Sequence, residues 1–89
     1  NNKFVDVSCD AGDKVTGGGV FVSGSNAGGA TPFSEGELAD HINIVENRKL
    51  GGSSLTWRVR AHEVPYGTNP VGQKGWKLTA QVFCADVTP

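Results

Sequence analysis

The chain has 89 residues, a formal net charge of −1 and 37% hydrophobic residues. This length predicts one domain with a modest core, near the size at which cross-links add useful stability. A net charge so close to zero argues against non-specific nucleic-acid binding, which requires a broad positive potential. The longest apolar run is only a few residues, so we expect no membrane span. We expect a single β domain over residues 1–89, either mature or excised from a longer exported chain.

The chain opens with the pattern of a strand, a tight turn and a second strand. Residues 4–9 alternate between apolar and polar side chains, which is typical of a half-buried strand. Residues 10–13, Asp-Ala-Gly-Asp, have the chemistry of a turn. Residues 15–23 read as the second strand, and we expect the two strands to pair as a hairpin.

Three consecutive glycines, Gly17 to Gly19, lie inside this second strand. Strand glycines weaken a sheet and mark a bulge, a bend or the close approach of another group. Their spacing fits neither the dinucleotide-binding fingerprint nor the phosphate-binding loop. Two tryptophans, Trp57 and Trp76, are available to cover the glycines. We expect both rings to cap the core near the glycine triplet and the cysteines.

The middle of the chain alternates between loops and strands. Residues 24–34 have no periodicity and read as a loop, and residues 34–37, Ser-Glu-Gly-Glu, resemble a capping box that predicts one helical turn. Residues 41–47 read as a strand, residues 55–61 give the clearest alternation in the chain, and residues 65–75 form a second long loop.

The last strand places one set of side chains inward and another outward. The inward set is Trp76, Leu78, Ala80, Val82 and Cys84, and the outward set is Lys77, Thr79, Gln81 and Phe83. Few helical signals and frequent Gly and Pro turns predict an all-β fold. We expect a small antiparallel β-sandwich or barrel of five to seven strands.

The only cysteines, Cys9 and Cys84, lie in the first and last predicted strands. A disulfide between them would stabilise the fold by roughly 4–4.5 kcal/mol in the chain-entropy model, a large share of a typical stability of about 5–15 kcal/mol. We favour a disulfide that joins the first and last strands, which indicates a secreted or extracellular protein. The alternative is two buried free thiols in a cytosolic protein.

No motif in the sequence predicts catalysis. Residues 51–55 lack the final glycine of a nucleophile elbow and precede a strand instead of a helix. Glu35, Glu37, Asp40 and His41 match the spacing of no zinc or calcium motif, so a solvated loop is the simpler interpretation. We therefore expect no enzyme, no cofactor and no metal site.

One polar face is the best candidate for a ligand. Arg58, Arg60 and His62 share one face of their strand, and Lys77 joins them if the two strands are neighbours. Tyr66, in the second long loop, is a further candidate contact for a sugar or a partner. The alternative is an ordinary solvated outer face, which two-layer β proteins have.

A set of motifs resembles those of small domains in exported bacterial proteins: Cys9-x-Ala11-Gly12-x-x-Val15-x-Gly17-Gly18-Gly19, then Trp57-x-Val59, Trp76 and Val82-x-Cys84-Ala85. Similar domains lie at the ends of larger surface, collagen-like or phage-tail-type chains. The resemblance covers most of the chain, which has Asp10 where proline is frequent. It implies an extracytoplasmic β domain with paired cysteines, and it supplies no catalytic residue.

From these observations we expect a non-enzymatic extracellular binding or structural head domain. Its partner would be a glycan, a cell-surface protein or further copies of the chain as a homo-oligomer. The alternative is a small secreted inhibitor or toxin-like protein that acts through its long loops.

Overall fold

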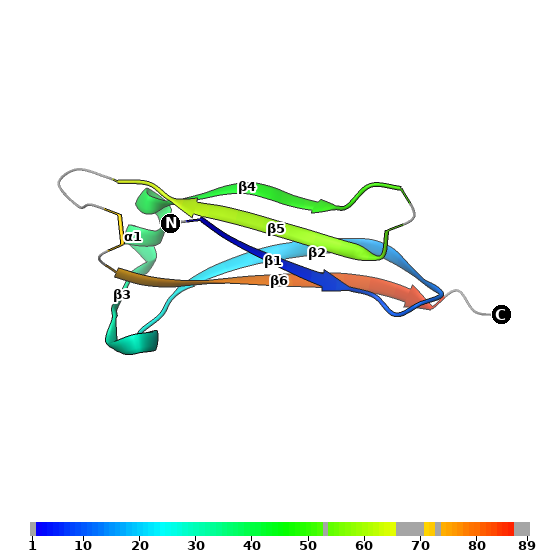
Figure 1. The fold of residues 1–89 in the computed structure, drawn as a ribbon, viewed down its shortest axis with the longest axis horizontal. Coiled ribbons are helices and arrows are strands. Elements are labelled where there is room, and N and C mark those ends of the chain that lie inside the picture. The colour runs from blue at the N-terminus through cyan, green and yellow to red at the C-terminus, as the bar shows by residue number, and fades with distance from the viewer. Residues whose placement is uncertain (1, 53, 66–70, 73, 87–89) are drawn as a thin grey trace.

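The structure, a computed structural model, describes residues 2–52, 54–65, 71, 72 and 74–86. These residues form an all-β sandwich of two sheets with one helix at one end (Figure 1). The elements are β1 (Asn2–Ser8), β2 (Asp13–Gly24), the 3-10 turn η1 (Ala27–Gly29), β3 (Thr31–Pro32), α1 (Glu35–His41), β4 (Ile42–Lys49), β5 (Thr56–Glu63) and β6 (Lys74–Asp86). No helix in these ranges is long and apolar enough to cross a membrane.

The two sheets have the strand orders β1-β5-β4 and β2-β6-β3. All pairs are antiparallel except β3 with β6, which is parallel over two residues. β1 and β5 lie over β6, and β4 lies over β2. The sandwich fold is therefore confirmed.

The predicted hairpin between residues 4–9 and 15–23 is wrong. β1 pairs with β5 and β2 pairs with β6, so the first two strands belong to different sheets. The turn at residues 10–13 forms as predicted, with the Asp13 amide donating to the Asp10 carbonyl at 3.1 Å. This turn carries the chain from one layer to the other. The apolar faces of the two strands consequently meet across the core.

The core lies between the two sheets and beside the helix. Its buried residues are Phe33, Leu38, Val59, Ala61, Trp76 and Leu78. Val59 and Ala61 are completely buried, which confirms the alternation predicted for residues 55–61. The inward and outward sets predicted for the last strand also hold near its start, where Trp76 and Leu78 are buried and Lys77 is exposed.

A disulfide closes the end of the sandwich opposite the helix. Cys9, directly after β1, is bonded to Cys84 of β6 with a Cα–Cα distance of 5.8 Å. The Cys9 amide also donates to the Leu55 carbonyl at 2.9 Å, which ties this end to β5. The predicted link between the first and last strands is therefore confirmed.

The capping box at the start of α1 is also confirmed. The Ser34 hydroxyl accepts from the Glu37 amide at 3.3 Å, and a Glu37 carboxylate oxygen accepts from the Ser34 amide at 3.1 Å. The helix extends beyond the single turn expected and ends at His41, where the sequence predicted a strand. His41 is buried because its ring stacks on Phe33 and its Nδ1 lies 3.0 Å from the Val64 carbonyl oxygen.

The two tryptophans lie at different places along the sandwich. The Trp57 ring packs on Gly18, as predicted. Trp76 pairs with Gly24 at the start of β6, eight residues before Cys84. Eight strand residues span about 27 Å, so the expectation that both rings lie near the cysteines and the glycine triplet is wrong for Trp76.

Two glycines, Gly24 and Gly75, allow the chain to cross over the beginning of β6. A Cβ on Gly75 would lie 2.1 Å from the Ser25 carbonyl oxygen, and one on Gly24 would lie 2.2 Å from the Phe33 carbonyl oxygen. The backbone after β2 thus passes over the outer face of β6 at Gly75. There β3 pairs with Lys74 and Gly75.

Candidate binding surfaces

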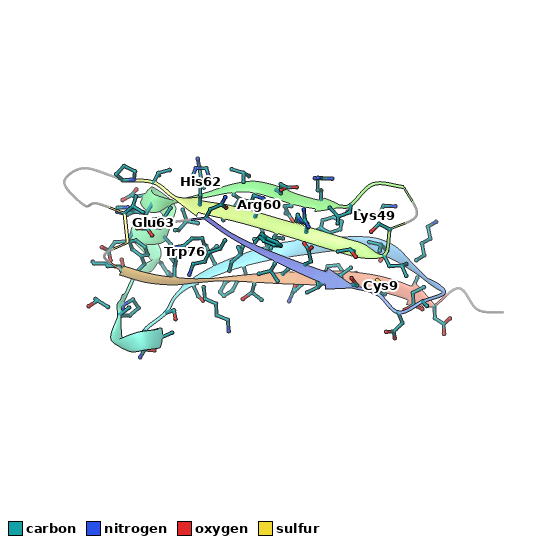
Figure 2. All side chains as sticks on the ribbon, in the orientation of Figure 1. Cys9, Lys49, Arg60, His62, Glu63 and Trp76 are labelled. Carbon is teal, nitrogen blue, oxygen red and sulfur yellow. A yellow bond between two sulfur atoms is a disulfide. The ribbon has the colours of Figure 1, made fainter. Side chains whose placement is uncertain are left out.

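The structure divides the predicted ligand residues between two faces. Arg58, Arg60 and His62 lie on β5, in the middle of the sheet β1-β5-β4. Figure 2 labels Arg60 and His62 on this strand. Lys77 lies on β6 in the other sheet, so the condition for joining it to the arginine face is not met. Tyr66 and most of the loop at residues 65–75 lie outside the described residues.

The arginines of this face are bonded to acidic side chains of the neighbouring strands. Arg58 donates from Nε and from a terminal nitrogen to the two carboxylate oxygens of Asp6, both at 2.8 Å. Arg60 donates to Glu46 at 2.7 Å, and Arg48 donates to the other Glu46 oxygen at 3.0 Å. The hydrogen bonds from Arg58 lower the pKa of Asp6, and those from Arg60 and then Arg48 lower the pKa of Glu46.

An exposed aromatic ring completes this network. The Phe4 ring centroid lies 5.2 Å from Cζ of Arg58 and 5.0 Å from Cζ of Arg60, and 55% of Phe4 is exposed. Each such cation–π contact is worth about 0.5–1 kcal/mol at an exposed site. The guanidinium groups therefore already have partners within their own sheet, as in a solvated outer face that is stabilised by cross-strand pairs.

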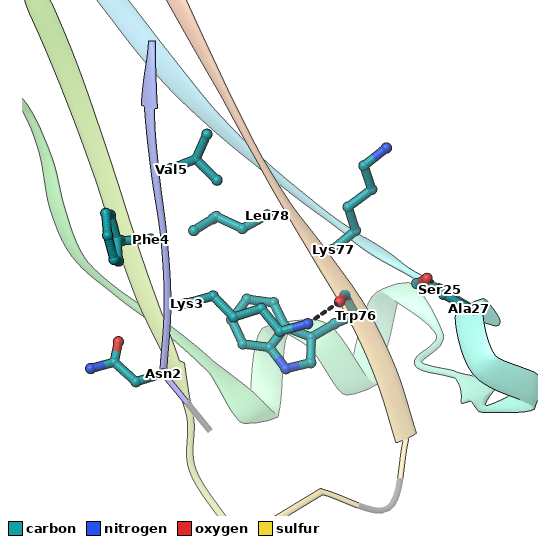
Figure 3. Close-up of a pocket in the computed structure, with 9 residues that line it drawn as sticks. All are labelled: Asn2, Lys3, Phe4, Val5, Ser25, Ala27, Trp76, Lys77 and Leu78. Carbon is teal, nitrogen blue, oxygen red and sulfur yellow. Dashed lines mark hydrogen bonds between the residues drawn. The ribbon is translucent and has the colours of Figure 1, made fainter.

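A groove on the side of the sandwich, between β1 and β6, was not predicted from the sequence (Figure 3). Its volume is about 740 Å³. The lining residues used below are Lys3, Val5, Ser25, Trp76, Lys77 and Leu78. Ser25, on the chain that crosses β6, is among the lining residues, and the disulfide joins the chain after β1 to β6.

Lys3 and Trp76 form the centre of the groove. The Lys3 ammonium donates to the Trp76 carbonyl oxygen at 2.6 Å and lies 4.6 Å from the Trp76 ring centroid. The indole Nε1 donates to Glu63 at 3.2 Å, and the second Glu63 oxygen accepts from the Gly72 amide at 2.8 Å. Glu63 is only 4% exposed, so the indole is fixed from within the protein.

The described residues that line the groove include two cationic side chains. Lys3 and Lys77 both line it, and no Asp or Glu is among its described lining residues. The ion pairs of the described residues involve Arg48, Arg58, Arg60 and Lys74. An ammonium group has three N–H donors, and Lys3 directs one of them to the Trp76 carbonyl. The groove is therefore suited to an anionic group.

Neither the described side chains nor comparison with known proteins indicates a particular chemistry. Within the described ranges, no three His, Cys, Asp or Glu side chains are grouped as metal ligands would be. No protein-family model, no curated protein and no solved structure matches this chain. Among the described residues, the groove is thus the feature best suited to hold a ligand.

Proposed function

We propose that the chain is a non-enzymatic, extracytoplasmic binding domain that holds an extended acidic segment of a partner protein in the groove between β1 and β6. The observation that carries this proposal is the Lys3–Trp76 pair, where an ammonium group lies over a buried indole in a groove whose described lining includes no acidic residue. The Cys9–Cys84 disulfide supports an oxidising compartment.

The residues that line the groove favour a polypeptide ligand over a sugar. Sugars stack on exposed aromatic faces, whereas Trp76 is 2% exposed and Lys3 lies over its ring. The apolar side chains of Val5 and Leu78 also line the groove, and these suit the alternate side chains of an extended peptide. The lysines would then hold its carboxylates by charge-assisted hydrogen bonds.

Four probes test this proposal by calorimetric titration into the oxidised domain. Three are blocked hexapeptides with the same apolar positions, in which the alternate polar positions carry Glu, Gln or Lys. The fourth is a galacturonate hexamer, an acidic glycan. We expect only the Glu peptide to bind, with an affinity that falls as the salt concentration rises.

Two variants show whether the groove is the site. Lys3→Gln should weaken binding of the Glu peptide about tenfold, since a charge-assisted hydrogen bond contributes about 1.5–3 kcal/mol. Lys14→Gln is the matched control, because Lys14 pairs with Ala85 near the disulfide end of β6. Three outcomes would contradict the proposal: undetectable binding of the Glu peptide, equal binding of all three peptides, or an equal loss of affinity in both variants. Binding of the galacturonate hexamer alone would replace it with acidic-glycan recognition.

A further inference from the structure

Along the groove, the described residues leave one edge of β6 without a strand partner. β6 pairs with β2 along most of its length, and β3 pairs only with Lys74 and Gly75, where the Gly75 carbonyl accepts from the Ser25 amide after β2 and from the Phe33 amide after β3. From Trp76 onward, the described residues place no strand along the edge of β6 that faces away from β2. The groove lies along this edge, between β6 and β1.

The direction of the backbone groups on β6 follows from two hydrogen bonds. The Phe83 carbonyl accepts from Thr16 of β2, so it faces the paired edge, and the Trp76 carbonyl accepts from Lys3 on the opposite side. Backbone groups of successive strand residues alternate between the two edges. Leu78, two residues after Trp76, therefore also directs its amide and carbonyl toward the groove.

The Lys3 ammonium occupies the place of a missing backbone donor. In a β-sheet the Trp76 carbonyl would accept from the amide of a neighbouring strand, and here it accepts from a side-chain N–H at 2.6 Å (Figure 3). An incoming strand amide can take over this bond. Lys3 would then be free to pair with an acidic side chain of the same incoming strand, which accounts for a lysine at this position.

We infer that the partner segment binds by strand addition, as an extra β-strand that pairs with Trp76 and Leu78 on the edge of β6 that faces away from β2. This inference rests on the proposed function and specifies how the acidic segment is held. Backbone hydrogen bonds to β6 supply affinity that is independent of the peptide's sequence, and Lys3 selects acidic side chains. The crossing chain at Ser25 and the disulfide limit the added strand to a short segment.

The test is an N-methyl scan of the Glu hexapeptide, with one backbone amide methylated at a time. Because alternate amides of an added strand face β6, methylation at every second position should weaken binding about tenfold or more, while the intervening positions should change it less than about threefold. A flat profile would overturn strand addition. The unmethylated peptide would still bind, and Lys3→Gln would still weaken it, so the proposed function would stand.

Amide hydrogen exchange gives a second test, first in the free domain and then with the Glu peptide bound. We expect the Leu78 amide to exchange faster than the Lys77 and Thr79 amides, which face β2. On saturation with the Glu peptide, exchange of Leu78 should slow at least about tenfold. Equal protection of all three amides in the free domain would mean that the edge is occupied, and would overturn the inference.

Discussion

The indole ring of Trp57 lies directly against the backbone of Gly18. A Cβ added to Gly18 would be 2.3 Å from Cδ2 and 2.4 Å from Cε2 of the ring. The ring is also held in place, because its Nε1 donates to the Asn47 side chain at 2.9 Å. The middle glycine of the triplet is therefore required by a contact between the two sheets.

This contact predicts that Gly18→Ala lowers the free energy of unfolding by about 1–3 kcal/mol, the usual cost of overpacking a core. Gly19→Ala is the matched control, since a Cβ there would meet only the Gln81 side chain at 4.0 Å. Urea unfolding followed by tryptophan fluorescence measures both. Equal stability of the two variants would show that Trp57 can move away at little cost.

The disulfide predicts a large effect on stability. A bridge between residues 75 apart in sequence restricts the unfolded chain, and its loss should reduce the free energy of unfolding by about 4 kcal/mol. The double variant Cys9→Ala with Cys84→Ala, compared with the oxidised wild type by urea unfolding, measures this loss. The comparison requires that both proteins have a compact fold without urea. An unfolding midpoint of the double variant equal to that of the wild type would contradict the prediction.

The crossing of the chain over β6 predicts that Gly75→Ala is more damaging than a substitution in an open turn. A Cβ at Gly75 would collide with the backbone at Ser25, which cannot move without displacing the β2 end or η1. We expect a loss of about 3 kcal/mol. Gly51→Ala is the control, because a Cβ there has no atom within 4 Å. Thermal unfolding of both variants should show a lower midpoint for Gly75→Ala alone.

The start of α1 predicts a dependence of stability on pH. A hydrogen bond from Lys74, and then one from the Ser34 backbone, lower the pKa of Glu37 to about 2. A carboxyl with a lowered pKa contributes its full stabilisation above its ordinary value near 4.5, and this contribution is lost as the pH falls toward 2. Glu37→Gln should therefore lose less stability between pH 5 and pH 2.5 than the wild type does.

The control for the pH experiment is Glu35→Gln. Glu35 is in the same helical turn but forms no ion pair with the described residues. Its variant should follow the wild-type pH profile in urea unfolding. If Glu37→Gln also followed that profile, the pairing with Lys74 would not contribute to stability.

Much of the fold was predictable because it depends on local patterns. Alternation identified β1, β5 and β6, and the capping box at Ser34 located the start of α1. The pairing of Cys9 with Cys84 followed from their places in the first and last strands. The sheet order was not predictable in this way, since alternation shows which face of a strand is buried but not which strand lies beside it.

The groove could not be predicted for the same reason. Lys3 comes before the first strand predicted at residues 4–9, and Trp76 is 73 residues away from Lys3 in the sequence. Their contact depends on β1 lying over β6, which follows from the sheet order. Arg58 and Arg60, by contrast, were correctly placed on one face, but their pairing with Asp6 and Glu46 required knowledge of both neighbouring strands.

The position of the disulfide also determines how the domain responds to a mechanical load. When the chain is pulled from its two ends, the tension passes from Cys9 directly to Cys84 through the covalent bond, and the residues between them bear none of it. Those residues would otherwise add about 250 Å of length on unravelling. β1 precedes Cys9 and therefore lies in the path of the tension, so a pull on the oxidised domain acts on this wall of the groove while β2 to β5 carry no load. Reduction would make the whole sandwich extensible.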